Sequence, residues 1–116
     1  KLADMAIQQL EEYFSGKRRL FSLPMAPEGT QFMQDVWRAL MSIPYGEVRS
    51  YGDIARAIEN SKAARAVGMA NNKNPLPIII PCHRVIGSNG QLVGYAGGLG
   101  CKEKLLTLEK ENIEKE

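Results

Sequence analysis

The amino-acid sequence predicts a mainly α-helical fold with one small β-hairpin, and three observations lead to this prediction. Apolar residues recur at helical spacing in several segments, which end at Gly or Pro. Two of these segments are short and meet at a tight joint, which is the outline of a helix-turn-helix. Asn89-Gly90 stands between two short apolar runs and is a strong hairpin signal. A hairpin directly after a helix-turn-helix resembles the wing of a winged helix.

The length and composition are those of one globular domain. The chain has 116 residues, of which 44% are hydrophobic and 24% are charged, and this mixture argues against disorder and a coiled coil. No segment approaches the roughly 18 apolar residues that a membrane span needs, so no membrane partner is expected. Because the chain begins at Lys1 without a Met or a signal-peptide pattern, we expect a fragment of a longer protein.

Charge and cysteine content narrow the possibilities further. The net charge of 15 − 13 = +2 is too small to indicate a nucleic-acid partner by itself. Cys82 and Cys101 can pair only once, so we expect an intracellular, reducing compartment. With two Cys and one His, the chain is short of soft ligands for a structural zinc site.

Two helices are predicted before residue 46. The first contains the apolar positions of residues 5–14, has Asp4 in its first turn and stops at Gly16. Residues 17–28, which include two prolines, are predicted to be an extended connector, and Thr30 can cap the second helix. The apolar stripe of that helix, and the turn that ends it, are Phe32, Val36, Leu40 and Ile43, followed by Pro44-Tyr45-Gly46.

The predicted helix-turn-helix follows this turn. Ser50 and Asp53 fit a capping box at the start of its first helix, and Ser61 can cap the second helix from Lys62 to about Asn71. The residues expected to face inward are Ile54, Ala55, Ile58, Ala63, Ala66, Val67 and Ala70. A packed helix pair that binds no DNA has the same pattern, so spacing alone leaves DNA binding open.

The C-terminal part is predicted to contain the hairpin and one more helix. Residues 76–80 are expected to form a buried extended run broken by prolines. Residues 84–86 and 91–93 are the expected hairpin strands, and residues 95–98 a loop. The last helix is expected from about Cys101 to Asn112, with a charged tail that frays from Glu109 onward. Its core side is expected to be Leu105, Leu106 and Leu108.

Cys82 and the neighbouring His83, the chain's only histidine, form a candidate nucleophile and base. A free thiol, with a pKa of about 8.5, is only a few per cent ionised at neutral pH, and a nearby base raises that fraction. His83 can serve directly or through water if a carboxylate holds its other nitrogen. A buried structural cysteine beside a satisfied histidine has the same sequence, so the pair alone does not decide. Cys101 has no such setting.

An ordered set of motifs surrounds this pair. The central strings are IPCHRVI at 80–86, GYAGGL at 94–99 and KLL at 104–106. Upstream are VW at 36–37, IPYGEV at 43–48, SY at 50–51, ARAVG at 64–68 and NP at 74–75. From about residue 29 to residue 109, this pattern closely resembles the O6-alkylguanine-DNA alkyltransferases. Met33, where many members have Gln, and Ala96, where some have Ser, are departures.

The resemblance implies a division of the chain into two parts. Residues 1–28 would be a helix and connector from the end of the family's N-terminal domain. Residues 29–116 would be the winged-helix-like C-terminal domain, which binds DNA and accepts the alkyl group. The family's zinc, where it occurs, is associated with the missing N-terminal part, so no metal and no cofactor are expected here.

The resemblance also implies a chemistry. Cys82 would attack the alkyl carbon on guanine O6 and keep it as a thioether in a single turnover. His83 would form the thiolate through a water, and Glu109 would orient His83. Asn74 would brace the turn that presents Cys82. The same reaction is expected for O4-alkylthymine.

The implied partner is double-stranded DNA, bound in the minor groove by a monomer. The damaged nucleotide must flip out to reach a buried thiol, and Arg65 would fill the vacated stack. The implied base-contacting residues are Tyr51, Tyr95, Ala96 and Val85. The implied DNA-contacting residues are Arg65, Ser50, Ala66, Gly68 and Arg84. From charge alone, the cations expected to reach phosphates are Arg49, Lys62, Arg65, Lys73 and Arg84, with Lys102 and Lys104 as further candidates.

Two alternatives remain at this point. Some relatives replace the cysteine with Trp and flag lesions without repairing them, so a non-catalytic module that binds alkylated DNA is one. A winged-helix regulator is the other, although it does not explain Cys82-His83, Tyr95 or Glu109.

Overall fold

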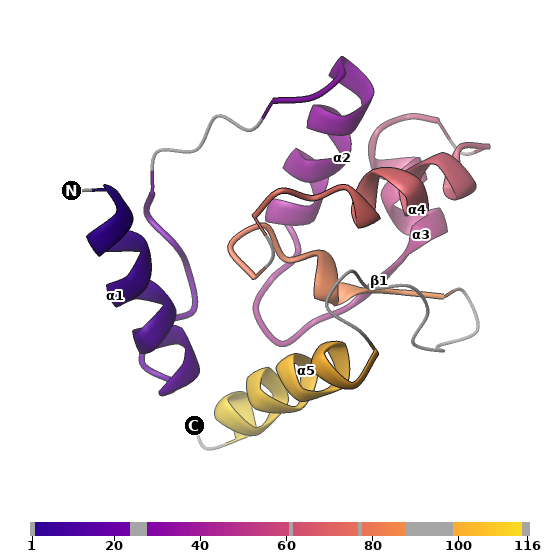
Figure 1. The fold of residues 1–116 in the computed structure, drawn as a ribbon. Coiled ribbons are helices and arrows are strands. Elements are labelled where there is room, and N and C mark those ends of the chain that lie inside the picture. Colours follow the sequence, from indigo (N-terminus) through magenta and orange to yellow (C-terminus); the bar gives the residue numbers. More distant parts are fainter. Residues whose placement is uncertain (1, 24–27, 61, 77, 88–98, 115–116) are drawn as a thin grey trace.

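The computed structural model describes residues 2–23, 28–60, 62–76, 78–87 and 99–114. These residues form a mainly helical fold, as the sequence predicts, and they contain one small sheet (Figure 1). The elements are α1 (Leu2–Phe14), α2 (Gln31–Met41), β1 (Arg49–Ser50), α3 (Tyr51–Ala57), α4 (Ala64–Asn72), β2 (Val85–Ile86) and α5 (Leu99–Glu114), with a 3-10 turn at Cys82–Arg84. Within the described ranges, no helix is long and apolar enough to cross a membrane.

Local side-chain caps begin two of the helices. The Thr30 hydroxyl accepts a hydrogen bond from the Met33 amide at 3.1 Å at the start of α2. The predicted capping box begins α3, because Ser50 Oγ accepts from the Asp53 amide at 3.0 Å and Asp53 accepts from the Ser50 amide at 2.9 Å. These bonds satisfy amides that the first turn of a helix leaves free.

The main core lies between α2, α3 and α4. Val36, Leu40 and Val67 are fully buried there, and the Trp37 indole donates to the carbonyl of Ala70 at 3.0 Å. Cys82 and Val85 belong to the same cluster of buried residues. The helix-turn-helix therefore packs directly against the segment that carries the candidate nucleophile.

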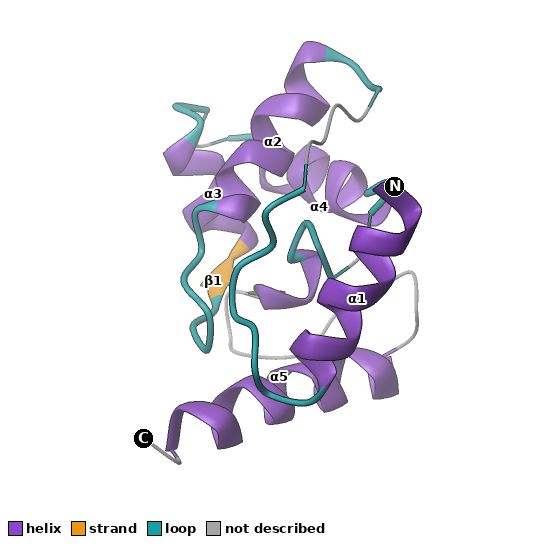
Figure 2. Ribbon diagram, turned by 90° about the vertical axis from the view of Figure 1, so that its left-hand side faces the viewer, coloured by secondary structure: helices purple, strands orange, loops and turns teal. Residues whose placement is uncertain are grey.

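A second cluster joins α1 to α5, which approach each other at the C-terminal end of α1 (Figure 2). Tyr13 and Leu105 are buried in it together with Tyr45. Gly16, which ends α1 with a φ of +81°, lies so close to Asn112 that an added Cβ would approach its oxygen to 2.9 Å. The Asn112 amide donates to the Gly16 carbonyl at 3.0 Å, so this tight approach fixes α1 on α5.

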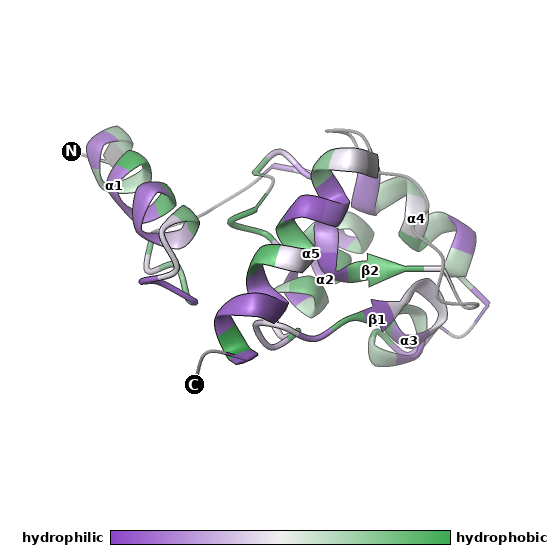
Figure 3. Ribbon diagram, turned by 90° about the horizontal axis from the view of Figure 1, so that it is seen from below, coloured by the Kyte–Doolittle hydropathy of each residue, from purple (hydrophilic) through white to green (hydrophobic). Residues whose placement is uncertain are grey.

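The small sheet pairs segments that are distant in sequence. β1 and β2 run parallel, with Arg49 opposite Val85 and Ser50 opposite Ile86, and Figure 3 shows them side by side. β2 lies within the predicted first hairpin strand. The predicted second strand, residues 91–93, falls outside the described residues.

Four local expectations were wrong. Ile78 and Ile79 lie in a turn and not in an extended run, because the Ile80 amide donates back to the Leu76 carbonyl at 2.8 Å. α4 begins at Ala64 and not at Lys62, and the predicted cap Ser61 lies outside the described residues. Ala66 is exposed and does not face inward. The charged tail remains helical to Glu114, because Glu109 and Asn112 contact the rest of the fold.

Candidate active site and DNA-binding surface

Cys82 is held at the start of a tight turn. Its amide donates to the Ile80 carbonyl at 2.7 Å, and Cys82 is only 3% exposed. The Asn74 side-chain amide donates to the same carbonyl at 2.8 Å, while its oxygen accepts from the Leu76 amide at 2.9 Å. Asn74 therefore closes the loop before Cys82, which is the bracing position that the resemblance implies.

His83 is fully buried and contacts the carboxylate of Glu109. The distance from His83 Nε2 to Glu109 Oε2 is 2.7 Å. Because a carboxylate only accepts, Nε2 carries the proton and Nδ1 keeps its lone pair. Nδ1 is buried and has no hydrogen-bond partner among the described residues. The imidazole is thus oriented so that Nδ1 is the nitrogen able to take a proton.

The surroundings of His83 favour its neutral form. Burial lowers the pKa of His83, and the positive charges of Arg84 and Lys102 lower it further. The contact with Glu109 acts in the opposite direction but is outweighed. A neutral imidazole is the form that can act as a base near neutral pH.

Glu109 is the centre of a buried hydrogen-bond network. Besides His83, its carboxylate accepts two bonds from Arg84, at 2.9 and 3.0 Å, and one from the Gly46 amide at 3.1 Å. The Tyr13 hydroxyl donates to Oε2 at 2.5 Å. Burial alone would raise the pKa of Glu109, but the contacts with His83, Arg84 and Tyr13 hold it at about 2. The carboxylate is therefore ionised at neutral pH.

The network uses the Arg84 side chain completely. Arg84 is 5% exposed, and its remaining nitrogen, Nη1, donates to the Ile43 carbonyl at 2.9 Å. The expectation that Arg84 contacts DNA does not fit this geometry, because its guanidinium is committed inside the protein. Lys102 is also fully buried, so the same correction applies to it.

Lys102 lies instead in the environment of the thiol. Burial lowers the pKa of Lys102, while interaction with the charge of Cys82 raises it. Sequence reasoning placed Lys102 on the surface, although a signal was available. Lys102 and Glu109 are seven residues apart on α5, which places both on the same helix face as the buried Leu105.

Tyr51 and Asn71 approach Cys82 from the helix-turn-helix. Burial raises the pKa of Tyr51, the charge of Cys82 raises it further, and a hydrogen bond with Asn71 partly opposes this. Asn71 is buried, and its amide lies 3.4 Å from the Cys82 carbonyl. Tyr51 therefore keeps its hydroxyl proton near the nucleophile. The sequence did not single out Asn71. Asn72 has the same side chain and is exposed, and the sequence alone does not tell which of the two is buried.

The surface of α4 is formed by small side chains and carries one prominent cation. Arg65 and Ala66 are exposed at its start, and Gly68 packs against Tyr51, whose ring would lie 3.8 Å from an added Cβ. Ala70 is buried and does not contribute to that surface. Ser50 is half-buried, and its hydroxyl is used in the helix cap.

The remaining predicted base contacts are only partly described. Val85 is fully buried in the main core, so its side chain does not line an open surface. Tyr95 and Ala96 lie outside the described residues.

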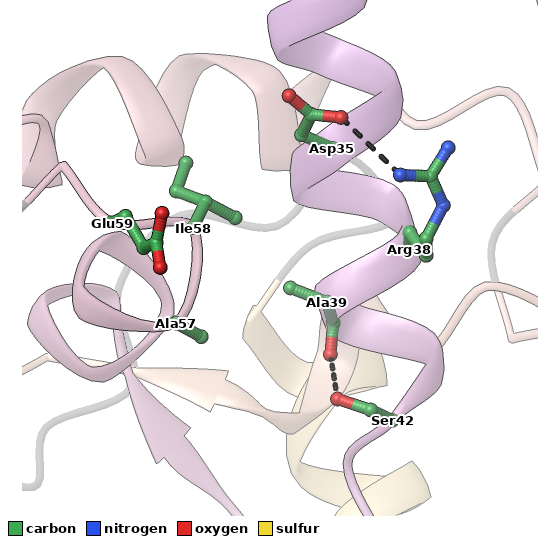
Figure 4. A pocket seen from close by; sticks show the side chains of 7 residues that line it. All are labelled: Asp35, Arg38, Ala39, Ser42, Ala57, Ile58 and Glu59. Carbon is green, nitrogen blue, oxygen red and sulfur yellow. Dashed lines mark hydrogen bonds and ion pairs between the residues drawn. The ribbon is translucent and has the colours of Figure 1, made fainter.

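A surface pocket elsewhere on the molecule does not belong to this site. It has a volume of about 390 Å³ and lies between α2 and the end of α3 (Figure 4). Its polar lining includes the Asp35–Arg38 ion pair, Ser42 and Glu59. None of these residues contacts Cys82, His83 or Glu109 in the interactions described above. Among the described residues, no group of three or more His, Cys, Asp or Glu side chains could hold a metal ion.

Comparison with known proteins assigns the family. Residues 31–111 match the sequence profile of the 6-O-methylguanine DNA methyltransferase, DNA binding domain. The chain belongs to this methyltransferase family. The match begins at α2 and ends within α5, so it contains Cys82, His83 and Glu109 but not Tyr13.

Curated members of the methyltransferase family are similar over most of the chain. A methylated-DNA–protein-cysteine methyltransferase from Methanosarcina mazei is 61% identical over 105 residues, which are 90% of this chain and 66% of that protein. The constitutive enzyme of that name from Bacillus subtilis is 58% identical, over 90% of this chain and 64% of its own length. The chain thus spans about two thirds of these relatives.

Solved structures of the methyltransferase family share the fold. Mycobacterium tuberculosis OGT, crystallised in complex with DNA, gives a TM-score of 0.92 at 53% identity over 94% of this chain and 68% of that chain. Schizosaccharomyces pombe Atl1, in complex with DNA containing O6-carboxymethylguanine, gives 0.59 at 31% identity over 74% of this chain and 79% of that chain. The winged-helix-like fold class predicted from sequence is therefore confirmed.

The pKa values at this site predict an acid-sensitive fold. His83 has a folded pKa below its ordinary 6.5, so its contribution to stability is complete above pH 6.5 and is lost below it. Glu109, with a folded pKa of about 2 against 4.5, contributes fully above pH 4.5 and loses this contribution as the pH falls toward 2. We expect urea unfolding to show a free energy of unfolding that decreases below pH 6.5 and decreases more steeply below 4.5.

The His83→Gln variant provides the control for this pH dependence. Because the chain has one histidine, this variant should lose the step that begins at pH 6.5 and keep the step that begins at 4.5. A free energy of unfolding that rises as the pH falls from 6.5 would contradict the assignment of a neutral, buried His83.

Proposed function

We propose that this chain repairs DNA by direct reversal, in which Cys82 takes the alkyl group from O6-alkylguanine. The single observation that carries the proposal is a thiol on a braced turn beside a buried, neutral histidine whose tautomer is set by a carboxylate. In a member of the methyltransferase family, this arrangement fits the generation of a thiolate.

The proposed reaction transfers one alkyl group and one proton. The Cys82 thiol gives its proton to His83 Nδ1 through a water, and the sulfur then attacks the alkyl carbon. A sulfur–carbon bond forms while the bond from carbon to guanine O6 breaks. The electron pair of the broken bond goes to guanine, which takes up one proton and becomes ordinary guanine. The protein retains a thioether.

The same chemistry implies that each molecule acts once. A thioether is not opened by thiol exchange, which acts on disulfides. Cys101, the other cysteine, is exposed on α5, while Cys82 is buried at the turn. We extend the proposal to O4-alkylthymine, which presents an alkyl group on an exocyclic oxygen in the same way.

The proposed DNA surface is the helix-turn-helix formed by α3 and α4. Ala66 and Gly68 give α4 a small face that suits the minor groove, which is only about 6 Å wide. Because Cys82 is buried, the damaged nucleotide must leave the stack to reach it. Tyr51 would contact the flipped base, and Tyr95 with Ala96 would complete the wall of its pocket. The DNA complexes of M. tuberculosis OGT and S. pombe Atl1 support DNA as the partner.

Intact-mass measurement after incubation with an O6-methylguanine duplex tests the proposal. Alkyl transfer predicts a mass gain of one methylene group on Cys82. DNA binding without a mass gain would favour the non-catalytic module that recognises alkylated DNA. Equal binding of damaged and undamaged duplexes without a mass gain would favour the winged-helix regulator.

The division at residue 28 and the monomeric state stay predictions.

Arg65→Ala tests the flipping step separately from the chemistry. Arg65 is exposed at the start of α4, and a side chain that fills the vacated stack offsets part of the cost of extrusion, a few kcal/mol. We expect repair of duplex DNA to slow by about 10- to 100-fold, or roughly 1.4 to 2.7 kcal/mol. Reaction with free O6-benzylguanine should slow much less, because a free base needs no flipping.

Arg38→Ala is a matched control, since Arg38 is an exposed arginine on a different helix, α2. It should leave both rates close to those of the unchanged chain. If Arg65→Ala slows the duplex and the free base equally, Arg65 supports the fold or the thiolate, and its role in flipping should be dropped.

A further inference from the structure

Helix α1 contributes a polar group to the buried carboxylate. Tyr13 is 0% exposed, and its hydroxyl donates to Glu109 Oε2 at 2.5 Å across 96 residues of sequence. The same oxygen accepts from His83 Nε2 at 2.7 Å and from Arg84 Nη2 at 3.0 Å. Tyr13 lies outside residues 31–111, which match the family profile, so it comes from a segment that the DNA-binding domain does not include.

The position of this hydroxyl is set by packing. The Tyr13 ring meets the Tyr45 ring edge-on at 6.1 Å between centroids and lies 5.7 Å from the Phe21 ring. The hydrogen bond between Asn112 and Gly16 holds the end of α1 against α5, one turn beyond Glu109. A ring fixed in this way delivers its hydroxyl to one place with little loss of side-chain entropy.

We propose that Tyr13 is a positioning residue for alkyl transfer, because its hydroxyl fixes the Glu109 carboxylate and reduces the negative charge that this carboxylate presents to His83. The inference rests on the proposed function of His83 as a base. A carboxylate with fewer donors would hold a proton on the imidazole more strongly. An imidazolium cannot accept the thiol proton, so the Tyr13 hydroxyl keeps His83 in its useful form.

The charged and titratable neighbours of His83 and Glu109 show why Tyr13 is the informative residue to replace. His83 faces Glu109 and Lys102 from α5, and it adjoins Arg84 and Cys82 in its own turn. Glu109 faces Arg84, His83, the Gly46 amide and Tyr13. Burial and Glu109 both raise the pKa of Tyr13, so it remains a neutral donor. Removing its hydroxyl thus changes the hydrogen bonding without changing the net charge.

Tyr13→Phe is the direct test, with Tyr45→Phe as the matched control. Tyr45 lies in the same cluster, but its hydroxyl contacts Asn112 and not Glu109. Because the chain has one histidine, NMR titration of the full chain reports the His83 pKa without overlap. We expect Tyr13→Phe to raise that pKa by about one unit, which is a tenfold change in the proton equilibrium. Tyr45→Phe should leave it unchanged.

The pH dependence of alkyl transfer gives the second readout. In Tyr13→Phe, the acid limb of the rate profile should move up by the same unit, so the rate on that limb falls about tenfold. The plateau at higher pH should change little. A purely structural role would instead lower the rate equally at every pH and leave the His83 titration where it was, and this outcome would overturn the inference.

Site-specific replacement of Tyr13 by a trifluorotyrosine covers the case in which Tyr13→Phe does not fold. The ring shape is nearly retained, and the more acidic hydroxyl is a stronger donor, so the His83 pKa should shift downward. No shift would overturn the inference. The titration needs no alkyl transfer, so the two claims fail separately. If the His83 pKa shifts as predicted but the chain never gains mass from the O6-methylguanine duplex, only the proposed function is refuted.

Discussion

Cys82→Ser should abolish alkyl transfer and leave DNA binding unchanged. A free thiol has a pKa of about 8.5, while a serine hydroxyl is far less acidic, so it supplies almost no oxyanion at neutral pH. The hydroxyl is also similar in size, so the turn at Cys82–Arg84 and the surface of α4 should remain intact. Single-turnover rates on an O6-methylguanine duplex measure alkyl transfer, and a gel-shift titration measures DNA affinity.

Cys101→Ser is the matched control for this prediction. Cys101 is exposed on α5, and it lies one residue from the buried Lys102. Its replacement should leave transfer and affinity as they were. If Cys101→Ser were the inactive variant and Cys82→Ser remained active, the nucleophile would be wrongly assigned.

Glu109→Gln should cause the largest loss of stability among conservative single changes at this site. The amide cannot balance the buried guanidinium of Arg84, which is 5% exposed and pairs with Glu109 through two hydrogen bonds. Removing one partner of a buried ion pair costs about 3–5 kcal/mol, because the other charge stays buried without compensation. Equilibrium unfolding in urea at neutral pH measures this loss.

Glu111→Gln offers a comparison on the same helix. Glu111 is exposed on α5, and a surface change of this kind alters stability by only about 0.5 kcal/mol or less. If Glu109→Gln were no more destabilising than Glu111→Gln, the carboxylate would not be the centre of a buried network.

Features set by neighbouring residues were predictable from sequence. The caps at Thr30 and Ser50 are such features, because the residues that make each bond are three positions apart. The stop of α1 at Gly16 is another, since its φ of +81° suits glycine. The motif around Cys82 indicated the family, which the comparisons confirm.

Features that depend on distant residues were not predictable in the same way. The run of isoleucines at 78–80 suggested an extended segment, but the side chain of Asn74 closes it into turns. Arg84 follows the nucleophile and looked like a surface cation, because nothing local shows that Glu109 folds back onto it. The Tyr13–Glu109 contact spans 96 residues, and periodicity within one helix carries no information on such a pair.

Titration of the protein with excess O6-methylguanine duplex tests directly whether Cys82 itself receives the alkyl group. Repaired lesions should reach a plateau equal to the protein concentration, and peptide mapping should find the methyl group on Cys82 alone. Continued repair beyond one equivalent, or a methyl group on another residue, would contradict this expectation.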